Sequence, residues 1–175
     1  MTQKPYALIL DTCVASDILN VDAEIFVLAA RYLGSICMPA VLIDELRECF
    51  QIVDPSEMGV DEIALTDEDR IEAVDLRERP GKSALSENDC ACAILAARLK
   101  CRCVTNDKLL QKTCEELGVP VWWGLEMVLE LCDRGGISFD RAEAFIIGLR
   151  RLTPYVNEKI EERFRARLEK IKARK

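Results

Sequence analysis

Short apolar runs alternate with helical patterns along most of this chain, and that alternation restricts its fold more than any other feature of the sequence. We expect strands at residues 6–10, 35–38, 62–65, 101–104 and 120–123, with helices in the connections between them. Strands that alternate with helices form parallel sheets whose two faces are both covered. The sequence therefore predicts an α/β fold of three layers, α/β/α, around a central parallel sheet.

Capping residues mark where several of these helices begin. Thr66 with Asp69, and Ser86 with Asp89, have the spacing of capping boxes, in which two side chains satisfy backbone N–H groups of the first turn. Asp22 is expected to cap the helix that follows it. These three helix starts are predicted from local sequence alone.

The chain becomes purely helical from Ser138 onward. We expect a domain over residues 1–136 and a two-helix appendage over residues 137–175 that packs on the domain or extends it. Residues 150–175 carry ten Lys and Arg against four Glu, so the appendage is basic. A basic helix pair can contact RNA, hold a protein partner or present solvated charges stabilised by i,i+4 pairs, and the sequence leaves these three alternatives open.

Composition limits both the fold and the chemistry. A chain of 175 residues, half of them apolar, has the size of a single domain with one core. It contains no histidine, which excludes His-based general bases, triads and metal ligands. Nine cysteines, an odd number, and an N-terminus without a signal-peptide layout favour a cytoplasmic location with reduced thiols. No apolar run approaches the roughly 20 residues that cross a bilayer, so we expect a soluble protein with no membrane partner.

The formal net charge is −7, which argues against a protein that binds nucleic acid over its whole surface. Residues 1–149 carry fourteen basic side chains against twenty-seven acidic ones, so the negative charge is concentrated before the basic tail. An acidic site that reaches phosphate through a bound metal remains compatible with this distribution.

Four acidic residues stand where such a site would form. Asp11 and Asp107 each follow an apolar strand, and ligands of parallel sheets gather at the C-terminal ends of strands. Glu45 and Asp89 lie on helices from which they can converge on the same edge. An all-oxygen site suits Mg²⁺ or Mn²⁺, which keep open positions for a substrate phosphate. The chemistry indicated is hydrolytic phosphoryl transfer.

Four segments, LILDTCV, VLIDEL, LSENDCACAILAARL and VTNDKLL, resemble the PIN-domain family, and particularly the VapC-like toxin ribonucleases of prokaryotic toxin–antitoxin pairs. The resemblance covers about residues 6–133. It implies a PIN-like fold and a catalytic metal site formed by Asp11, Glu45, Asp89 and Asp107. It further implies Mg²⁺ or Mn²⁺ as cofactor, an RNA substrate, a possible antitoxin protein as partner and a homodimer.

The chain departs from the family pattern at two places. PIN domains often carry Asn or Ser where this chain has Cys13, and Asp44 adjoins Glu45 as a second acid. Each acid of the proposed site also has an ordinary structural explanation. Asp89 fits a capping box, Asp107 an N-cap, Asp11 a turn at a strand end and Glu45 a solvated helix charge.

Other motifs admit two interpretations. Trp122 and Trp123 suggest a base-stacking platform, but neighbouring residues of a strand face opposite sides, which favours core packing over stacking. Thr105 and Asn106 fit a polar turn or a role in orienting the site, and Lys108 fits a solvated lysine or a phosphate contact. Four cysteines have a C-x-C…C-x-C pattern that suggests zinc, although residues two apart on a helix point about 200° apart and reduced cysteine is common in cores. They are Cys90, Cys92, Cys101 and Cys103.

The sequence therefore favours a metal-dependent endoribonuclease, the toxin of a toxin–antitoxin pair, over three alternatives. These are a catalytically weak PIN-like scaffold, a general RNA-processing nuclease and a receiver-like signalling domain centred on Asp11. A haloacid-dehalogenase-like phosphatase needs a second Asp two residues after the first, where this chain has Cys13. We therefore set that class of enzyme aside.

Overall fold

The computed structural model describes residues 6–50 and 54–175. Within them, one sheet of five strands has the order β3-β2-β1-β4-β5, and all neighbouring strands run parallel. The strands are β1 (Leu8–Leu10), β2 (Ile36–Pro39), β3 (Val60–Ile63), β4 (Arg102–Val104) and β5 (Val121–Trp122). The chain adds β2 and β3 on one side of β1 and then crosses to place β4 on the other. The strand order therefore reverses between β1 and β4.

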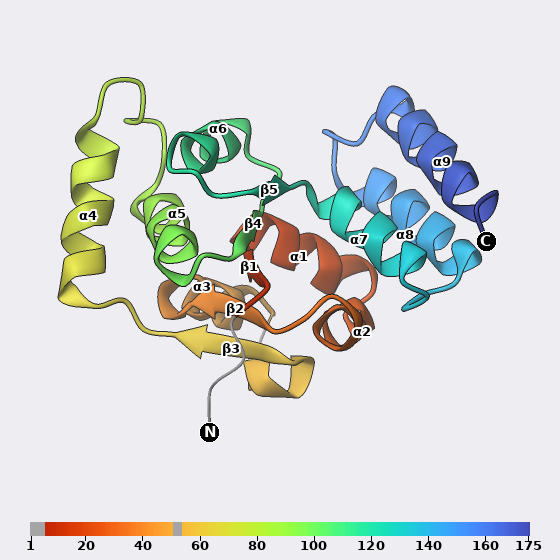
Figure 1. Ribbon diagram of the computed structural model, residues 1–175, viewed down its shortest axis with the longest axis horizontal. Helices are drawn as coiled ribbons and strands as arrows, with labels where there is room; N and C mark the ends of the chain where they lie inside the picture. The colour runs from red at the N-terminus through yellow and green to blue at the C-terminus, as the bar shows by residue number, and fades with distance from the viewer. Residues whose placement is uncertain (1–5, 51–53) are drawn as a thin grey trace.

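Helices cover both faces of this sheet (Figure 1). On one face α5 contacts β1, β2 and β4, with α4 and α6 packed beside it, and α1, α2 and α7 lie on the other face. The described helices are α1 (Thr12–Val21), α2 (Glu24–Tyr32), α3 (Ala40–Phe50), α4 (Asp67–Glu78), α5 (Glu87–Leu99), α6 (Lys108–Glu116), α7 (Gly124–Asp133), α8 (Phe139–Leu152), α9 (Glu158–Lys172) and a short 3-10 helix, η1 (Pro55–Met58). The predicted α/β/α fold with a parallel central sheet is confirmed.

Continuous burial of β1 explains why its sequence is apolar at every position. Its three residues are at most 2% exposed, because helices cover the strand from both sides. Both predicted capping boxes are present, at the starts of α4 and α5. Strand β3 begins two residues earlier than predicted, directly after η1.

The prediction for Asp22 is wrong. The residue before α2 is Ala23, in a helical conformation and without a side-chain capping bond, and Asp22 instead closes α1. The carboxylate of Asp22 accepts two hydrogen bonds from Arg141 of α8, at 2.7 and 2.8 Å. A partner 119 residues away has thus replaced the local capping role. None of the described helices is long and apolar enough to span a membrane.

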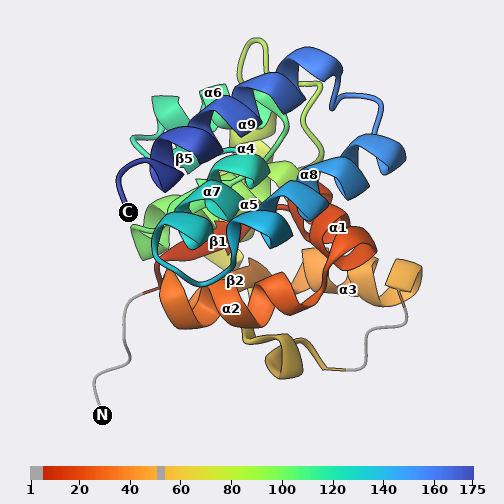
Figure 2. The same cartoon turned by 90° about the vertical axis from the view of Figure 1, so that its right-hand side faces the viewer.

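The two C-terminal helices pack on the layer formed by α1 and α7 (Figure 2). The predicted apolar face of α8, which includes Phe145 and Ile146, is buried, and so are Phe164 and Leu168 of α9. Gly148 allows α8 to approach α1 closely, since an added Cβ would lie 2.8 Å from Val21. These side chains belong to the same hydrophobic core as the sheet. The division at residues 136 and 137 stays a prediction.

Candidate functional site

Asp11 follows β1 at the edge where the strand order reverses, which is where ligands bind in open parallel sheets. It is 4% exposed. Its Oδ2 accepts a hydrogen bond from Thr105 Oγ1 at 2.7 Å and another from Cys13 Sγ at 2.8 Å. Burial raises the pKa of the Asp11 carboxyl above its ordinary value, whereas these two bonds act to lower it. The site is therefore organised around a desolvated and firmly oriented carboxylate.

Cys13 supplies a hydrogen bond at the position where PIN domains often have Asn or Ser. Although part of the Cys13 surface is exposed, desolvation of its thiol, reinforced by the charge of Asp11, raises the pKa of that thiol above its ordinary value. The thiol therefore stays protonated and able to donate to Asp11. Cys13 is therefore a sulfur donor to the carboxylate at the centre of the site.

The turn after β4 joins Asp11 to Asp107. The Thr105 hydroxyl donates to Asp11 and accepts from the backbone N–H of Asp107 at 3.1 Å. Asp107 is the N-cap of α6, and its Oδ1 accepts from the N–H of Leu110 at 2.7 Å. A carboxylate offers about four acceptor sites on two oxygens. Capping α6 therefore leaves Asp107 with acceptor capacity for a second role.

Asp89 occupies the third position of α5. Its Oδ2 accepts from the backbone N–H of Ser86 at 2.8 Å, while the Ser86 hydroxyl accepts from the N–H of Asp89 at 3.0 Å. The cap fixes the carboxylate at the helix N-terminus, beside the C-terminal ends of the strands. The negative charge of Asp89 contributes to the raised pKa of Asp11, so the two carboxylates are close enough to repel each other.

Glu45 and its neighbour Asp44 point in different directions from α3. The Glu45 carboxylate accepts from Thr12 Oγ1 at 2.9 Å and from the side-chain amide of Asn88. The Asp44 carboxylate is 65% exposed and pairs with Arg47 at 2.8 Å. Of the two adjacent acids, Glu45 therefore faces the other three.

All four predicted acids line one pocket of about 400 Å³, together with Asn88, Asn106 and Tyr155 among other residues. Among its described lining residues four are acidic and none is basic. Carboxylates in a partly desolvated pocket repel one another and so raise the free energy of the folded protein, and a bound cation relieves that repulsion. The structure thus brings together the four acids that the sequence singled out.

The four carboxylates of this pocket are possible ligands of a divalent metal. Among residues 6–50 and 54–175, no three His, Cys, Asp or Glu side chains are close enough to form a ready-made metal cage. Mg²⁺ usually keeps several waters and binds through one or two carboxylates plus a substrate phosphate. Four oxygen donors spread around an open pocket fit that mode of binding.

Comparison with known proteins supports the architecture. No model of a protein family matches the sequence, and no curated protein is similar to it in sequence. Among solved structures, a PilT N-terminus (PIN) domain protein from the hyperthermophilic archaeon Sulfolobus solfataricus P2 matches with a TM-score of 0.51 and 13% identity. The match covers 71% of this chain and 92% of that protein. The fold is PIN-like. At this identity the likeness concerns the fold alone, and the site depends on the geometry described above.

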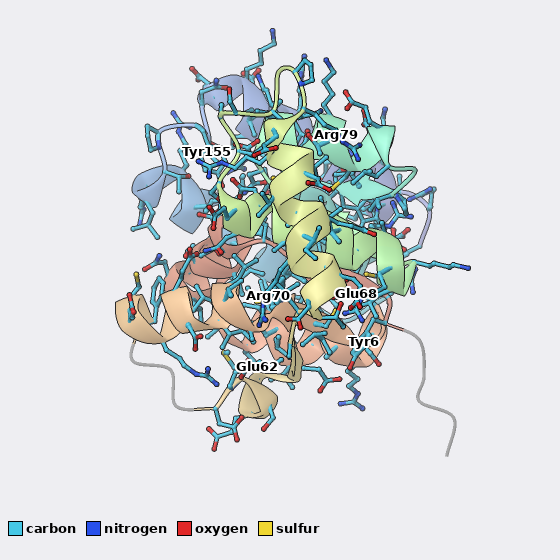
Figure 3. The ribbon with its side chains drawn as sticks, turned by 90° about the vertical axis from the view of Figure 1, so that its left-hand side faces the viewer. Tyr6, Glu62, Glu68, Arg70, Arg79 and Tyr155 are labelled. Atoms are coloured by element: carbon cyan, nitrogen blue, oxygen red, sulfur yellow. The ribbon has the colours of Figure 1, made fainter. Side chains whose placement is uncertain are left out.

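Sequence reasoning missed Tyr155 and Asp17. Tyr155 comes from the loop between α8 and α9, lines the pocket and donates to the Asp17 carboxylate. Asn106 joins both, because its amide donates to Asp17 at 3.0 Å and to the Tyr155 hydroxyl at 2.8 Å. In Figure 3 Tyr155 lies on the opposite side of the molecule from Tyr6, which precedes the first strand. No local pattern marks these residues, because their contacts span up to 138 positions.

The cysteine pattern has a core role. All nine cysteines are among the described residues and none forms a disulfide. Cys92 of α5 and Cys103 of β4 are buried, with their sulfurs 3.9 Å apart, whereas Cys101 Sγ is directed at the carbonyl oxygen of Ala96. This arrangement packs thiols between α5 and the sheet and does not gather four of them around one point.

Proposed function

We propose that this protein is an Mg²⁺- or Mn²⁺-dependent endoribonuclease that hydrolyses RNA phosphodiester bonds. The observation that carries the proposal is the pocket at the reversal of strand order, which four carboxylates line and in which no described lining residue is basic. Such a pocket repels a phosphate unless divalent cations bridge the two. The PIN-like fold and the four PIN-like sequence segments support the same assignment.

Each residue has a separate task in this proposal. Asp11, Asp89 and Asp107 hold the metal, and Glu45 assists from α3. The metal, when bound, supplies a water of lowered pKa and stabilises charge on the phosphate. Thr105 orients Asp11 and ties it to Asp107, so that two of the metal-binding acids move as a unit.

The direct test is an RNA cleavage assay with the full chain. We expect endonucleolytic products from single-stranded or structured RNA with Mg²⁺ or Mn²⁺, no products in EDTA, and recovery when metal is returned. A chain that gains stability with Mn²⁺ but cuts no RNA under any metal would instead be a PIN-like scaffold acting through protein contacts.

Glu45→Gln should lower the cleavage rate in a graded way, by about tenfold, which is typical for groups that support metal ligands. Gln keeps the shape of Glu. Both oxygens of Glu45 accept hydrogen bonds, from Thr12 and Asn88, so the amide NH₂ of Gln would face one of these two donors and lose that bond. Asp44→Asn is the matched control, and we expect its initial rate to stay within about twofold of wild type because surface changes are usually mild. A larger loss for Asp44→Asn than for Glu45→Gln would show that the wrong neighbour was chosen.

We further propose that the protein is the toxin of a toxin–antitoxin pair, as a homodimer in the cytoplasm. This narrower assignment rests on the resemblance of its four segments to VapC-like toxins. Its test is the neighbouring gene together with growth. Expression of the chain should arrest growth, and co-expression of a small DNA-binding protein encoded beside it should restore growth. Cleavage without such a neighbour would indicate a general RNA-processing nuclease.

A further inference from the structure

A second groove is lined by residues of α7 and α9. These two helices lie side by side (Figure 2). The groove has a volume of about 410 Å³ and combines apolar side chains with four basic ones. Among its described lining residues, Glu126 is the single acid, and it pairs with Arg167 at 3.1 Å. The other three basic residues, Lys108, Lys159 and Arg163, make no ion pair with any part of the chain that the structure describes. We call this surface the α9 groove.

The α9 groove adjoins the acidic pocket on both of its walls. Asp107 lines the pocket and the next residue, Lys108, lines the groove. On the opposite wall Tyr155 lines the pocket and Asn157 lines the groove. Consecutive Cα atoms are about 3.8 Å apart, so the two cavities are neighbours at Asp107 and Lys108.

Trp123 adds an aromatic surface at this junction. The residue after it, Gly124, donates its backbone N–H to Asn106 at 3.1 Å, which fixes the start of α7 against the pocket. Trp123 lines the α9 groove, whereas its neighbour Trp122 packs against the core with Arg102 over its ring at 4.3 Å. Trp122 also lines a different cavity, beside the second half of α9, so Trp123 is the tryptophan that faces the α9 groove.

The charge of the α9 groove differs from that of the second half of α9. Arg167, at the inner end of the groove, and Arg174, beyond it, pair with Glu126 and Asp133 of α7, so these two side chains are neutralised within the fold. Lys159 and Arg163 are one helical turn apart and share a face of α9. Lys159 and Arg163 thus place two positive charges without an internal partner at the end of α9 that lies nearest the acidic pocket.

We infer that the α9 groove binds single-stranded RNA and leads it into the acidic pocket, an inference that rests on the proposed nuclease. Lys108, Lys159 and Arg163 contact backbone phosphates, and a base stacks on Trp123. A cationic groove with an aromatic platform is the usual arrangement for binding single strands without sequence preference. An acidic peptide would match the charge alone. Continuity with a pocket suited to phosphodiester chemistry favours RNA.

The test measures binding apart from cleavage. A fluorescent single-stranded RNA of about 12 nucleotides, within the site size of such grooves, is titrated with the full chain in EDTA and followed by anisotropy. The groove variant is Lys159→Gln/Arg163→Gln. The control, Arg31→Gln/Lys100→Gln, removes the same charge from exposed residues that precede β2 and β4, at the opposite edge of the sheet. Point variants are needed because deleting α9 would remove Phe164 and Leu168 from the core.

We expect the groove variant to weaken RNA binding about tenfold at low salt and to lower the slope of log K against log salt by about 1 to 2, as expected for two lost phosphate contacts. The control should bind like wild type. Trp123→Ser should weaken binding about fivefold or more, and Trp123→Phe should restore most of it because stacking is retained. Melting temperatures in EDTA show that each variant is folded.

Equal RNA affinity in folded wild type and groove variant would overturn the inference, as would a wild-type chain that binds no RNA. If the variant keeps RNA affinity but loses a co-expressed partner, the groove belongs to a protein. If RNA binding depends on the groove but no metal-dependent cleavage occurs, the groove binds RNA and the proposed nuclease activity is wrong. If cleavage requires Asp11 but is unchanged in the groove variant, the nuclease proposal stands and the groove inference is wrong.

Discussion

Asp11→Asn and Asp107→Asn should each lower RNA cleavage by about 100-fold or more without unfolding the protein. Metal-held charge stabilisation contributes several kcal/mol to phosphoryl transfer, and each 1.36 kcal/mol is a factor of ten in rate. Asn keeps the shape of both side chains and remains a hydrogen-bond acceptor for Thr105 at position 11 and for Leu110 at position 107. What is lost is negative charge in the pocket.

Asp54→Asn is the matched control for the Asp107 variant. Asp54 also caps a helix, η1, through the backbone N–H of Ser56 at 2.8 Å, but it does not line the pocket. Asn and Asp are nearly equivalent as N-caps, so both variants should keep near-wild-type melting temperatures. Initial rates at saturating Mn²⁺ measure the effect. If cleavage persists in a chain that carries Asp11→Asn and Asp107→Asn together, the metal site is elsewhere.

Local signals predicted much of the fold. The two capping boxes formed because Thr66 and Ser86 find their partners three residues away, within one turn of the helix. The buried face of α8 followed from helical spacing, since Phe145 and Ile146 face the core whatever lies beyond them. Where a residue and its partner share one turn or one face, sequence spacing contains the necessary information.

Long-range contacts account for what the sequence did not predict. Helix α1 has no side-chain cap, since Asp11 is committed to Thr105 and Cys13, so no capping signal marks its start in the sequence. Asp22 looked like an N-cap, but Arg141 offers it a bidentate charge-assisted pair that outweighs a local cap. Thr105 lies 94 positions from Asp11, and Arg141 lies 119 positions from Asp22, so local patterns in the sequence do not reveal these partners.

The candidate site shows the same division. The four acids were found because each follows a strand or begins or lies on a helix at the expected edge. The groups that hold them were not found. Thr12 and Asn88 fix Glu45, and Tyr155 reaches the pocket from the loop between α8 and α9. These contacts depend on how the helices pack, which spacing along the chain does not encode.

The apo protein should tolerate Asp89→Asn better than Asp69→Asn, although both residues stand third in a capping box. Asp69 is 3% exposed and pairs with Arg98 at 3.1 Å, so its replacement removes a charge-assisted bond that contributes about 1.5 to 3 kcal/mol. Asp89 instead repels Asp11, whose pKa it raises. Relief of that repulsion offsets the weaker helix-dipole interaction of Asn, which costs about 0.3 to 1 kcal/mol.

Mn²⁺ should stabilise the two variants unequally. Metal that binds only the folded state stabilises it by about 2.7 kcal/mol at a hundredfold excess over Kd. At about 2 to 4 °C per kcal/mol for a chain of this length, wild type and Asp69→Asn should both gain roughly 5 to 10 °C, and Asp89→Asn far less. Thermal melts of the three proteins in EDTA and in excess Mn²⁺ measure this without an RNA substrate. If both variants melt below wild type in EDTA and all three gain equally with Mn²⁺, Asp89 is a helix cap and not a metal ligand. Removing the charge of a metal ligand would reduce the stabilisation by Mn²⁺, whereas removing the charge of a helix cap would not.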